Sequence, residues 1–392
     1  MGVATGLDIL VSEQFLRIRG KSLGVLCNQA SVSRDYRHIL DILLPLHQSE
    51  ELKLASVMGP QHGLFGHTQD NMIEWEGAPD ARTALVIHSL YGETREPTSR
   101  MLRDVEILII DLQDVGARYY TFIWSMALCM KACDERGIPV CVLDRPNPLG
   151  GVQVEGNVLE PDFASFVGLF PLPIRHGMTI GEIARYLQTE HFPKVKLDVV
   201  AMQGWNRSAF HDETGAPWAM PSPNMPTVDT AVVYPGGCLL EATNLSEGRG
   251  TTRPFEILGA PYLNGWKFSE ALNGVKLPGV YFRPLQFEPT FHKHAKTLCE
   301  GVFVHVSDRA AFLPVLTYVA ILQEAVRQSP DQFAWKEPPY EYIFHLLPID
   351  ILAGNGRLRR DIETLRPLSE ISDEWAEECQ RFEPTRQASL LY

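Results

Sequence analysis

Residues 107–125, ILIIDLQDVGARYYTFIWS, constrain the fold of this chain more than any other segment. The four aliphatic residues 107–110 predict a parallel strand that is buried on both faces, because such a strand has no polar side. The run then ends in polar side chains, among them Asp111, Asp114 and Arg118. Ligands of open α/β sheets bind beyond the carboxyl ends of the strands, so the segment predicts a polar binding site at a sheet edge. The alternative is a strand end whose Asp caps a helix and pairs with the Arg.

Strand and helix segments alternate along the first half of the chain. Apolar runs that end in polar residues or turn formers predict strands at 21–29, 52–60, 83–92, 105–113 and 138–148. Helical patterns lie at 35–47 and from about 121 to 136, and a further helix opens at Thr179, where Glu182 completes a capping box. This alternation predicts an α/β fold with a mostly parallel, doubly wound sheet.

The second half of the chain has a different pattern. Long strands at 279–289 and 301–308 and a helix at 312–328 predict a smaller α+β domain. Between the halves, residues 217–231 contain four prolines, which favour a rigid linker or a loop that lines a site. We therefore predict an N-terminal domain of residues 1–228 and a C-terminal domain of residues 229–392. Ligand sites concentrate at domain interfaces, so we expect the active site in the cleft between them.

Composition excludes several classes of protein. The chain has 392 residues, enough for two domains. Its net charge of −13 argues against a nucleic acid as partner, and no apolar run approaches the roughly 20 residues of a membrane span. The first residues lack a basic segment followed by an apolar core, so we expect a cytoplasmic protein. Seven scattered cysteines favour buried free thiols.

The sequence lacks the common nucleotide, nucleophile and metal motifs, which leaves carboxylate chemistry as the interpretation. The dinucleotide pattern GxGxxG, the phosphate loop GxxxxGK[ST], the nucleophile elbow GxSxG and the metalloprotease pattern HExxH are all absent, so we expect neither a cofactor nor a metal. Glycosidic cleavage needs an acid for the leaving oxygen and a second group at the anomeric centre. Residues 241–251 supply two carboxylates with Asn244 and Arg249 in eleven residues. Their alternative role is a well-capped turn.

Long and unusual strings connect the sequence to a known family. They are GPQHG (59–63), SLYGETREPT (89–98), DLQDVGARYYT (111–121), LDRPNPLGG (143–151), RHGMTIGE (175–182), PSPNMPT (221–227) and NLSEGRGTTRPFE (244–256). In these strings, which run in order through nearly the whole chain, the sequence closely resembles the NamZ-type exo-β-N-acetylmuramidases. The resemblance implies a Rossmann-like domain, a smaller second domain and an active site in the cleft between them.

The resemblance also implies an activity and a substrate. The family releases terminal β-linked N-acetylmuramic acid from the non-reducing end of peptidoglycan fragments. The expected partner is therefore a small saccharide, and neither a nucleic acid nor a membrane. A cytoplasmic member would act on imported or recycled muropeptide sugars, which would place it in cell-wall recycling.

Gln61 departs from the family pattern, in which many members carry Glu in the motif GPEHG. An amide cannot donate a proton as a carboxylic acid does, nor act as an anionic nucleophile. One explanation is that the acid lies elsewhere, with Glu74 the nearest carboxylate in sequence. Another is that Gln61 holds the acetamido carbonyl of the substrate while that group assists the reaction. In the third, the protein binds the amino sugar without hydrolysing it.

The candidate site follows from these segments. We expect catalysis by Glu74, Asp114 and Glu241, and substrate binding by Gln61, His62, Asp111, Arg118, Tyr119, Arg145, Asn224, Asn244 and Arg249. One of the three arginines should pair with the lactyl carboxylate, because a guanidinium binds carboxylates bidentately. Parallel strands end at one sheet edge, and the segment 217–251 joins the two domains, so most of these residues should face one cleft.

Overall fold

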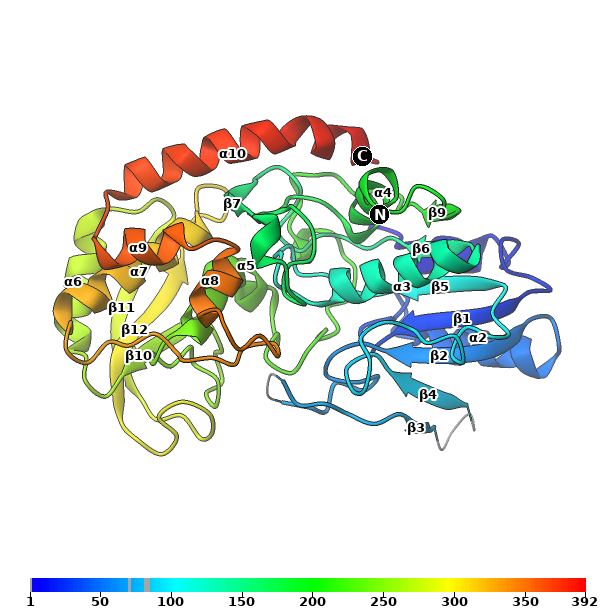
Figure 1. Cartoon of the computed structure of the whole chain (residues 1–392), viewed down its shortest axis with the longest axis horizontal. Coiled ribbons are helices and arrows are strands. Elements are labelled where there is room, and N and C mark those ends of the chain that lie inside the picture. The colour runs from blue at the N-terminus through cyan, green and yellow to red at the C-terminus, as the bar shows by residue number, and fades with distance from the viewer. Residues whose placement is uncertain (1, 70–71, 81–84) are drawn as a thin grey trace.

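The computed structural model describes residues 2–69, 72–80 and 85–392, which form two lobes (Figure 1). The larger lobe contains a seven-stranded sheet in the order β3-β4-β2-β1-β5-β6-β9. Neighbouring strands are parallel, apart from the antiparallel pair β3 and β4. The predicted α/β fold with a mostly parallel sheet is confirmed. The strands are β1 (Ser22–Cys27), β2 (Lys53–Gly59), β3 (Ala78–Pro79), β4 (Val86–Ser89), β5 (Ile107–Asp111), β6 (Val140–Leu143) and β9 (Leu197–Val200).

Helices cover both faces of this sheet. They are α1 (Gly6–Ser12), α2 (Ile39–Gln48), α3 (Phe122–Arg136) and α4 (Ile180–Glu190). Ile107 and Ile109 of β5 belong to one apolar core with α1 and α2, whereas Leu108 and Ile110 belong to the other with α3 and α4. Successive side chains of a strand point to opposite faces, so a strand between two helical layers needs apolar residues at every position.

Local signals set the helix ends in this domain. Thr179 Oγ1 accepts a hydrogen bond from the Glu182 amide at 3.2 Å, and Glu182 Oε2 accepts one from the Thr179 amide at 2.9 Å. This is the predicted capping box, and α4 begins at the next residue. Helix α3 ends at Gly137, whose φ of 68° suits a residue without a Cβ.

The smaller lobe is α+β, as predicted. Its sheet has the order β10-β12-β11, and both strand pairs are antiparallel. Helix α6 packs on β11 and β12, and α7 packs on α5. The elements are α5 (Val228–Gly237), β10 (Ile257–Ala260), α6 (Gly265–Val275), β11 (Val280–Phe287), β12 (Cys299–Val306), α7 (Pro314–Gln328), α8 (Pro348–Ala353) and α9 (Arg357–Glu363).

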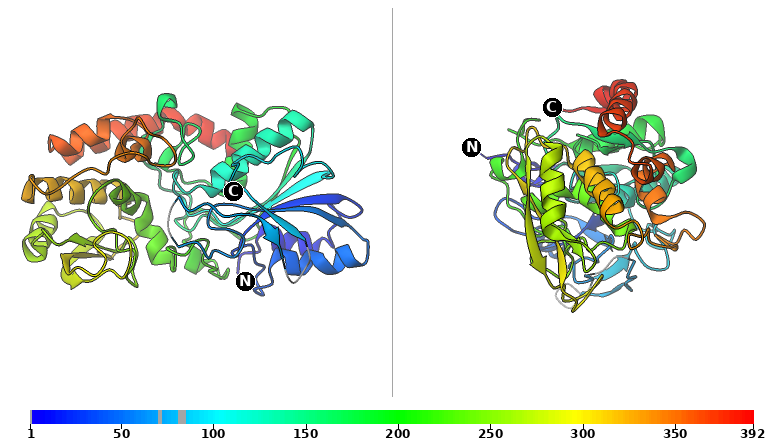
Figure 2. Two further views of the ribbon diagram at one scale, coloured as in Figure 1. Left: turned by 60° about the horizontal axis from the view of Figure 1, so that its bottom comes forward. Right: turned by 90° about the vertical axis from the view of Figure 1, so that its left-hand side faces the viewer.

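The last helix joins the two lobes. Helix α10 (Leu368–Ser389) runs from the smaller lobe across the top of the molecule and packs against α4 and the short strand β7 (Glu155–Val158), which pairs with β8 (Pro173–Arg175) (Figures 1 and 2). The predicted boundary at 228 coincides with the first residue of α5. The domain boundary itself remains a prediction. Helix α10, which lies beyond it in the sequence, packs against α4 and β7 of the larger lobe. Short 3-10 helices η1 (Pro161–Phe163) and η2 (His211–Glu213) lie in the connecting loops.

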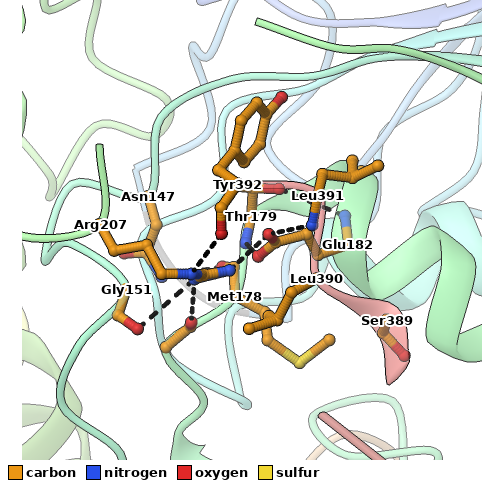
Figure 3. Close-up of polar contacts among 12 residues, drawn as sticks. Asn147, Gly151, Met178, Thr179, Glu182, Arg207, Ser389, Leu390, Leu391 and Tyr392 are labelled. Carbon is orange, nitrogen blue, oxygen red and sulfur yellow. Dashed lines mark hydrogen bonds and ion pairs between the residues drawn. The ribbon is translucent and has the colours of Figure 1, made fainter. Parts of the chain in front are cut away.

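The end of the chain is bound to the larger lobe (Figure 3). Arg207 Nε donates to the main-chain oxygen of Tyr392 at 3.2 Å, and the Leu391 amide donates to Glu182 Oε1 at 2.9 Å. The Tyr392 hydroxyl donates to Asp144 Oδ2 at 2.7 Å. These contacts attach the residues that follow α10 to the larger lobe.

Two further features bear on the class of protein. In the described part of the chain, no helix combines the length and the apolarity that crossing a membrane requires. All seven cysteines are free, and six of them are buried, so the prediction of buried free thiols holds for every one except the partly buried Cys379.

Candidate active site

A pocket lies where the carboxyl-end loops of the large sheet meet the smaller lobe. Its cavity volume is about 30 Å³, well below the roughly 300–1,000 Å³ typical of small-ligand sites, because side chains fill most of the space. Both predicted domains contribute to its walls. The polar lining residues are Gln61, His62, Tyr119, Tyr120, Thr121, Ser222, Asn224, Tyr234, Cys238, Glu241, Arg249, Tyr340 and Glu341.

The loop after β2 supplies Gln61 and His62. Gln61 is buried, and its Oε1 accepts a hydrogen bond from the Thr121 hydroxyl at 2.7 Å. Among the described residues, Gln61 Nε2 has no hydrogen-bond acceptor, so the amide can donate to a ligand. His62 has a φ of 69° and its Nδ1 lies 2.7 Å from the Thr68 carbonyl oxygen. Positive φ is rare outside glycine, and the tight turn after β2 holds both side chains at the pocket.

Glu241 lies on the opposite wall, in the 3-10 helix η3 (Cys238–Ala242) that follows α5. Arg249 Nη2 donates to its Oε1 at 2.8 Å, and the Tyr340 hydroxyl donates to its Oε2 at 2.7 Å. All three side chains are buried. Both carboxylate oxygens therefore act as acceptors of strong, partly charge-assisted hydrogen bonds.

A second buried carboxylate, that of Glu247, contacts Arg249 through Nη1, whereas Glu241 contacts Nη2. Glu247 lies 2.9 Å from Lys293 Nζ, 3.1 Å from His292 Nδ1 and 3.4 Å from Arg249 Nη1. Burial alone would raise the pKa of Glu247, but the charges of Lys293 and Arg249 and the hydrogen bond from His292 hold that pKa well below its usual value. Arg249 is thus fixed between two carboxylates, Glu241 at the pocket and Glu247 beneath it.

Glu341 comes from the loop between α7 and α8 and reaches the pocket at the junction of the lobes. It is 6% exposed, and the hydroxyl of the fully buried Tyr91 lies 3.0 and 3.2 Å from its two carboxyl oxygens. Burial raises the pKa of Glu341 to about 7 against the lowering effects of Tyr91 and Arg95, and the negative charge of Glu241 adds to the rise.

The structure brings half of the expected residues together. Gln61, His62, Tyr119, Asn224, Glu241 and Arg249 all line the pocket, although almost two hundred residues separate the outermost. Asn224 Nδ2 donates to the Gln69 carbonyl oxygen at 2.8 Å, and the Tyr119 hydroxyl donates to the Pro235 carbonyl oxygen. The pocket thus draws residues from both sides of the predicted boundary at 228.

The carboxylates after β5 do not line this pocket. Asp111 is fully buried and accepts hydrogen bonds from Arg145 Nε and Nη2 at 2.5 and 2.9 Å. Asp114 Oδ2 accepts a hydrogen bond from the Gly116 amide at 2.7 Å and lies 3.2 Å from His176 Nε2. Asp111 thus pairs with Arg145 and not with Arg118 of its own segment, and Asp114 accepts within its own turn, so both differ from the helix cap paired with that Arg that the sequence offered as the alternative.

Three more predicted residues lie outside the pocket. Arg118 donates to four main-chain oxygens of the described residues, those of Asn157 and Leu172 in the larger lobe and of Leu352 and Ala353 in α8. Asn244 accepts from the Tyr262 hydroxyl at 2.6 Å and the Ala334 amide at 3.1 Å. Glu74 has a side chain 48% exposed, paired with Arg95 at 3.3 Å, and faces a different surface hollow.

Sequence reasoning missed Tyr340 and Glu341. They stand in the string PPYEY at 338–342, where two prolines precede an acid flanked by tyrosines. Such a string indicates an ordered loop, but the long-range fold decides which site the loop reaches. Within residues 2–69, 72–80 and 85–392, no group of three His, Cys, Asp or Glu could hold a metal ion.

Comparisons with known proteins agree with this architecture. The family model described as Exo-beta-N-acetylmuramidase NamZ, N-terminal, matches residues 23–229, and its C-terminal counterpart matches residues 232–392. The Peptidoglycan beta-N-acetylmuramidase NamZ of Bacillus subtilis (strain 168) is 43% identical over 390 residues, which cover 100% of this chain and 91% of that protein.

Two solved structures share the fold. Both are DUF1343 family proteins of Bacteroides fragilis NCTC 9343. BF0371 is 32% identical with a TM-score of 0.89, and BF0379 is 27% identical with a TM-score of 0.77. Each alignment covers 100% of this chain and 99% of the other.

Proposed function

The chain belongs to the NamZ family of exo-β-N-acetylmuramidases, and from that premise we propose that it hydrolyses the terminal β-linked N-acetylmuramic acid at the non-reducing end of peptidoglycan fragments. The observation that carries the proposal is the pocket between the lobes, where carboxyl groups, a guanidinium and amides face one small space. Glycoside hydrolysis needs two such acid–base or nucleophilic groups on either side of the scissile bond.

Glu241 is the group that meets the positive charge developing at the anomeric centre. Arg249 and Tyr340 donate to its two oxygens and fix the carboxylate in one orientation. A carboxylate held in this way is preorganised for the transition state, because no reorientation is needed as the charge forms. It acts either as the nucleophile or by electrostatic stabilisation.

Gln61 binds the acetamido group of the substrate in this proposal. Its Oε1 is occupied by the Thr121 hydroxyl, which leaves the Nε2 hydrogens directed to a carbonyl acceptor. A sugar with an N-acetyl group supplies that acceptor. The amide at position 61 is therefore compatible with a binding role in a chain that keeps its hydrolytic carboxylates elsewhere.

Arg249 is the candidate for recognition of the lactyl carboxylate. Of the three arginines predicted for this role, it alone lines the pocket, whereas Arg118 and Arg145 are engaged beneath it. A guanidinium binds carboxylates bidentately, and Arg249 already contacts Glu247 and Glu241 through Nη1 and Nη2 in the wall of the pocket. Recognition of the lactyl carboxylate would select muramic acid over glucosamine. A cytoplasmic location and a role in cell-wall recycling remain predictions from the sequence.

The test is turnover of a chromogenic β-N-acetylmuramide by the purified protein. We expect release of the chromophore from the muramide and at least tenfold lower kcat/KM on the matching β-N-acetylglucosaminide, which lacks the lactyl ether. Equal rates on both sugars would refute the specificity argument. Binding of the muramide without turnover would instead favour the alternative that Gln61 raised, a non-catalytic amino-sugar-binding protein.

A further inference from the structure

Two carboxyl side chains face the pocket within the described residues, and their surroundings differ. Both oxygens of Glu241 are engaged by donors, the Arg249 guanidinium and the Tyr340 hydroxyl. Among the described residues, no cation lies within ion-pairing distance of Glu341, and its carboxyl group shares a hydrogen bond with the phenol of Tyr91. Pairs of carboxyl groups in such contrasting environments divide the roles of anion and acid in glycosidases.

The surroundings of Glu341 favour its neutral form. The titratable and charged groups that act on it are Tyr91 and Arg95 from the larger lobe and Glu241 from the smaller one. Burial is the largest effect and raises the pKa of Glu341 to about 7. At neutral pH a large fraction of Glu341 is thus protonated, which is the state that a general acid requires.

The loop that carries Glu341 is firmly positioned against the opposite lobe. Glu341 and Tyr342 have φ of 44° and 64°, values that other contacts must enforce in residues with a Cβ. The Arg95 guanidinium stacks between two rings, 4.0 Å from the centroid of Tyr91 and 4.9 Å from that of Tyr342. The Glu341 amide contacts Met72 Sδ at 3.2 Å. These contacts hold the carboxyl group at the junction of the lobes.

We propose that Glu341 is the catalytic acid that protonates the glycosidic oxygen, the role that Gln61 cannot perform. This inference rests on the proposed hydrolase function. The bond between the anomeric carbon and the glycosidic oxygen breaks, its electron pair stays on the oxygen, and the Glu341 proton completes the departing alcohol. Water then adds its oxygen to the anomeric carbon, and one of its protons restores the Glu341 carboxyl group, so the reaction consumes only water.

The dependence of the rate on the leaving group tests this role. A substrate with a poor leaving group, such as the disaccharide of N-acetylmuramic acid and N-acetylglucosamine, needs protonation far more than a dinitrophenyl muramide does. Loss of a general acid typically lowers the rate by about 10²–10⁴-fold. We expect Glu341→Gln to show a loss of that size on the disaccharide and a loss below about tenfold on the dinitrophenyl muramide.

Glu155→Gln is the matched control. Glu155 is also buried with its pKa raised to about 7 by burial, but it accepts a hydrogen bond from the Leu316 amide and does not line the pocket. It should keep the wild-type rates on both substrates. Equal losses on both substrates in Glu341→Gln, or no loss on either, would overturn the role of Glu341. Failure of the wild-type protein on every muramide would overturn the proposed function and this inference together.

A second variant tests the same role through pH. The Tyr91 hydroxyl lowers the pKa of Glu341, so Tyr91→Phe should raise that pKa and move the alkaline limb of kcat/KM to higher pH. Tyr91 is a positioning residue here. In the wild-type protein the limb should fall near pH 7, and in Glu341→Gln it should disappear from the residual activity. An alkaline limb unchanged in both variants would contradict the assignment.

Discussion

The buried pair of Asp111 and Arg145 offers a sharp test of which polar residues at the sheet edge are structural. In Arg145→Met, the Asp111 carboxylate stays buried at the end of β5 but loses the two hydrogen bonds that Arg145 donates to it. The Val32 carbonyl oxygen also loses the hydrogen bond that it accepts from Arg145. Breaking a buried ion pair from one side costs about 3–5 kcal/mol. Each kcal/mol lowers the melting temperature of a domain of this size by about 2–4 °C, so we expect a decrease of roughly 6–20 °C.

Thermal unfolding followed by circular dichroism measures this change. Arg309→Met is the matched control, because Arg309 pairs with the exposed carboxylates of Asp212 and Asp229, and surface pairs contribute no more than about 1 kcal/mol each. The double variant Asp111→Leu with Arg145→Met should recover part of the loss, since it leaves no unpaired charge in the core.

The kinetics of Arg145→Met separate a structural role from a binding role. At a temperature well below its melting point, the folded variant should keep the wild-type KM for the muramide, because Arg145 does not reach the pocket. A wild-type melting temperature combined with a KM raised tenfold or more would refute this reasoning. Arg145 would then bind the substrate, as the sequence alone suggested.

Three further predictions concern the pocket. Arg249→Lys should raise KM for the muramide about tenfold more than for the glucosaminide in steady-state assays, since a lysine lacks the planar fork. Above pH 7, urea titrations should show Glu341→Gln to be more stable than the wild type by on the order of 3 kcal/mol. The pKa of Glu341 is raised from 4.5 to about 7 in the folded protein. The stability that the protonated carboxyl group contributes is therefore fully present below pH 4.5 and is lost as the pH rises through about 7. Exhaustive chelation should leave muramide turnover unchanged, since the lining residues supply carboxylate chemistry; a loss restored by one divalent ion would contradict this.

The scaffold was predictable because its signals are local. The aliphatic run 107–110 indicates that β5 is buried on both faces, and the capping box of Thr179 indicates where α4 begins. Each depends on side chains within a few residues, so a single sequence suffices to read it. The convergence of Gln61 and His62 with Glu241 and Arg249 followed from the rule for strand ends and domain junctions.

The division of roles among similar polar residues was not predictable. Asp111 and Glu241 both follow apolar segments and both pair with an Arg, yet only Glu241 faces the pocket. Both are buried, so what distinguishes them is whether the side chain lines the pocket, and that depends on contacts between distant parts of the chain. Glu341 was missed for the same reason, since its partner Tyr91 lies 250 residues away in sequence.

We propose that a chain with Gln at position 61 still hydrolyses muramides through its two pocket glutamates, Glu241 and Glu341. The most direct measurement is the release of free N-acetylmuramic acid from the disaccharide of N-acetylmuramic acid and N-acetylglucosamine, followed by NMR alongside calorimetric binding. We expect equimolar release of both sugars by the wild type and none above background by the double variant Glu241→Gln with Glu341→Gln. Binding of the disaccharide by the wild type without any release would contradict it.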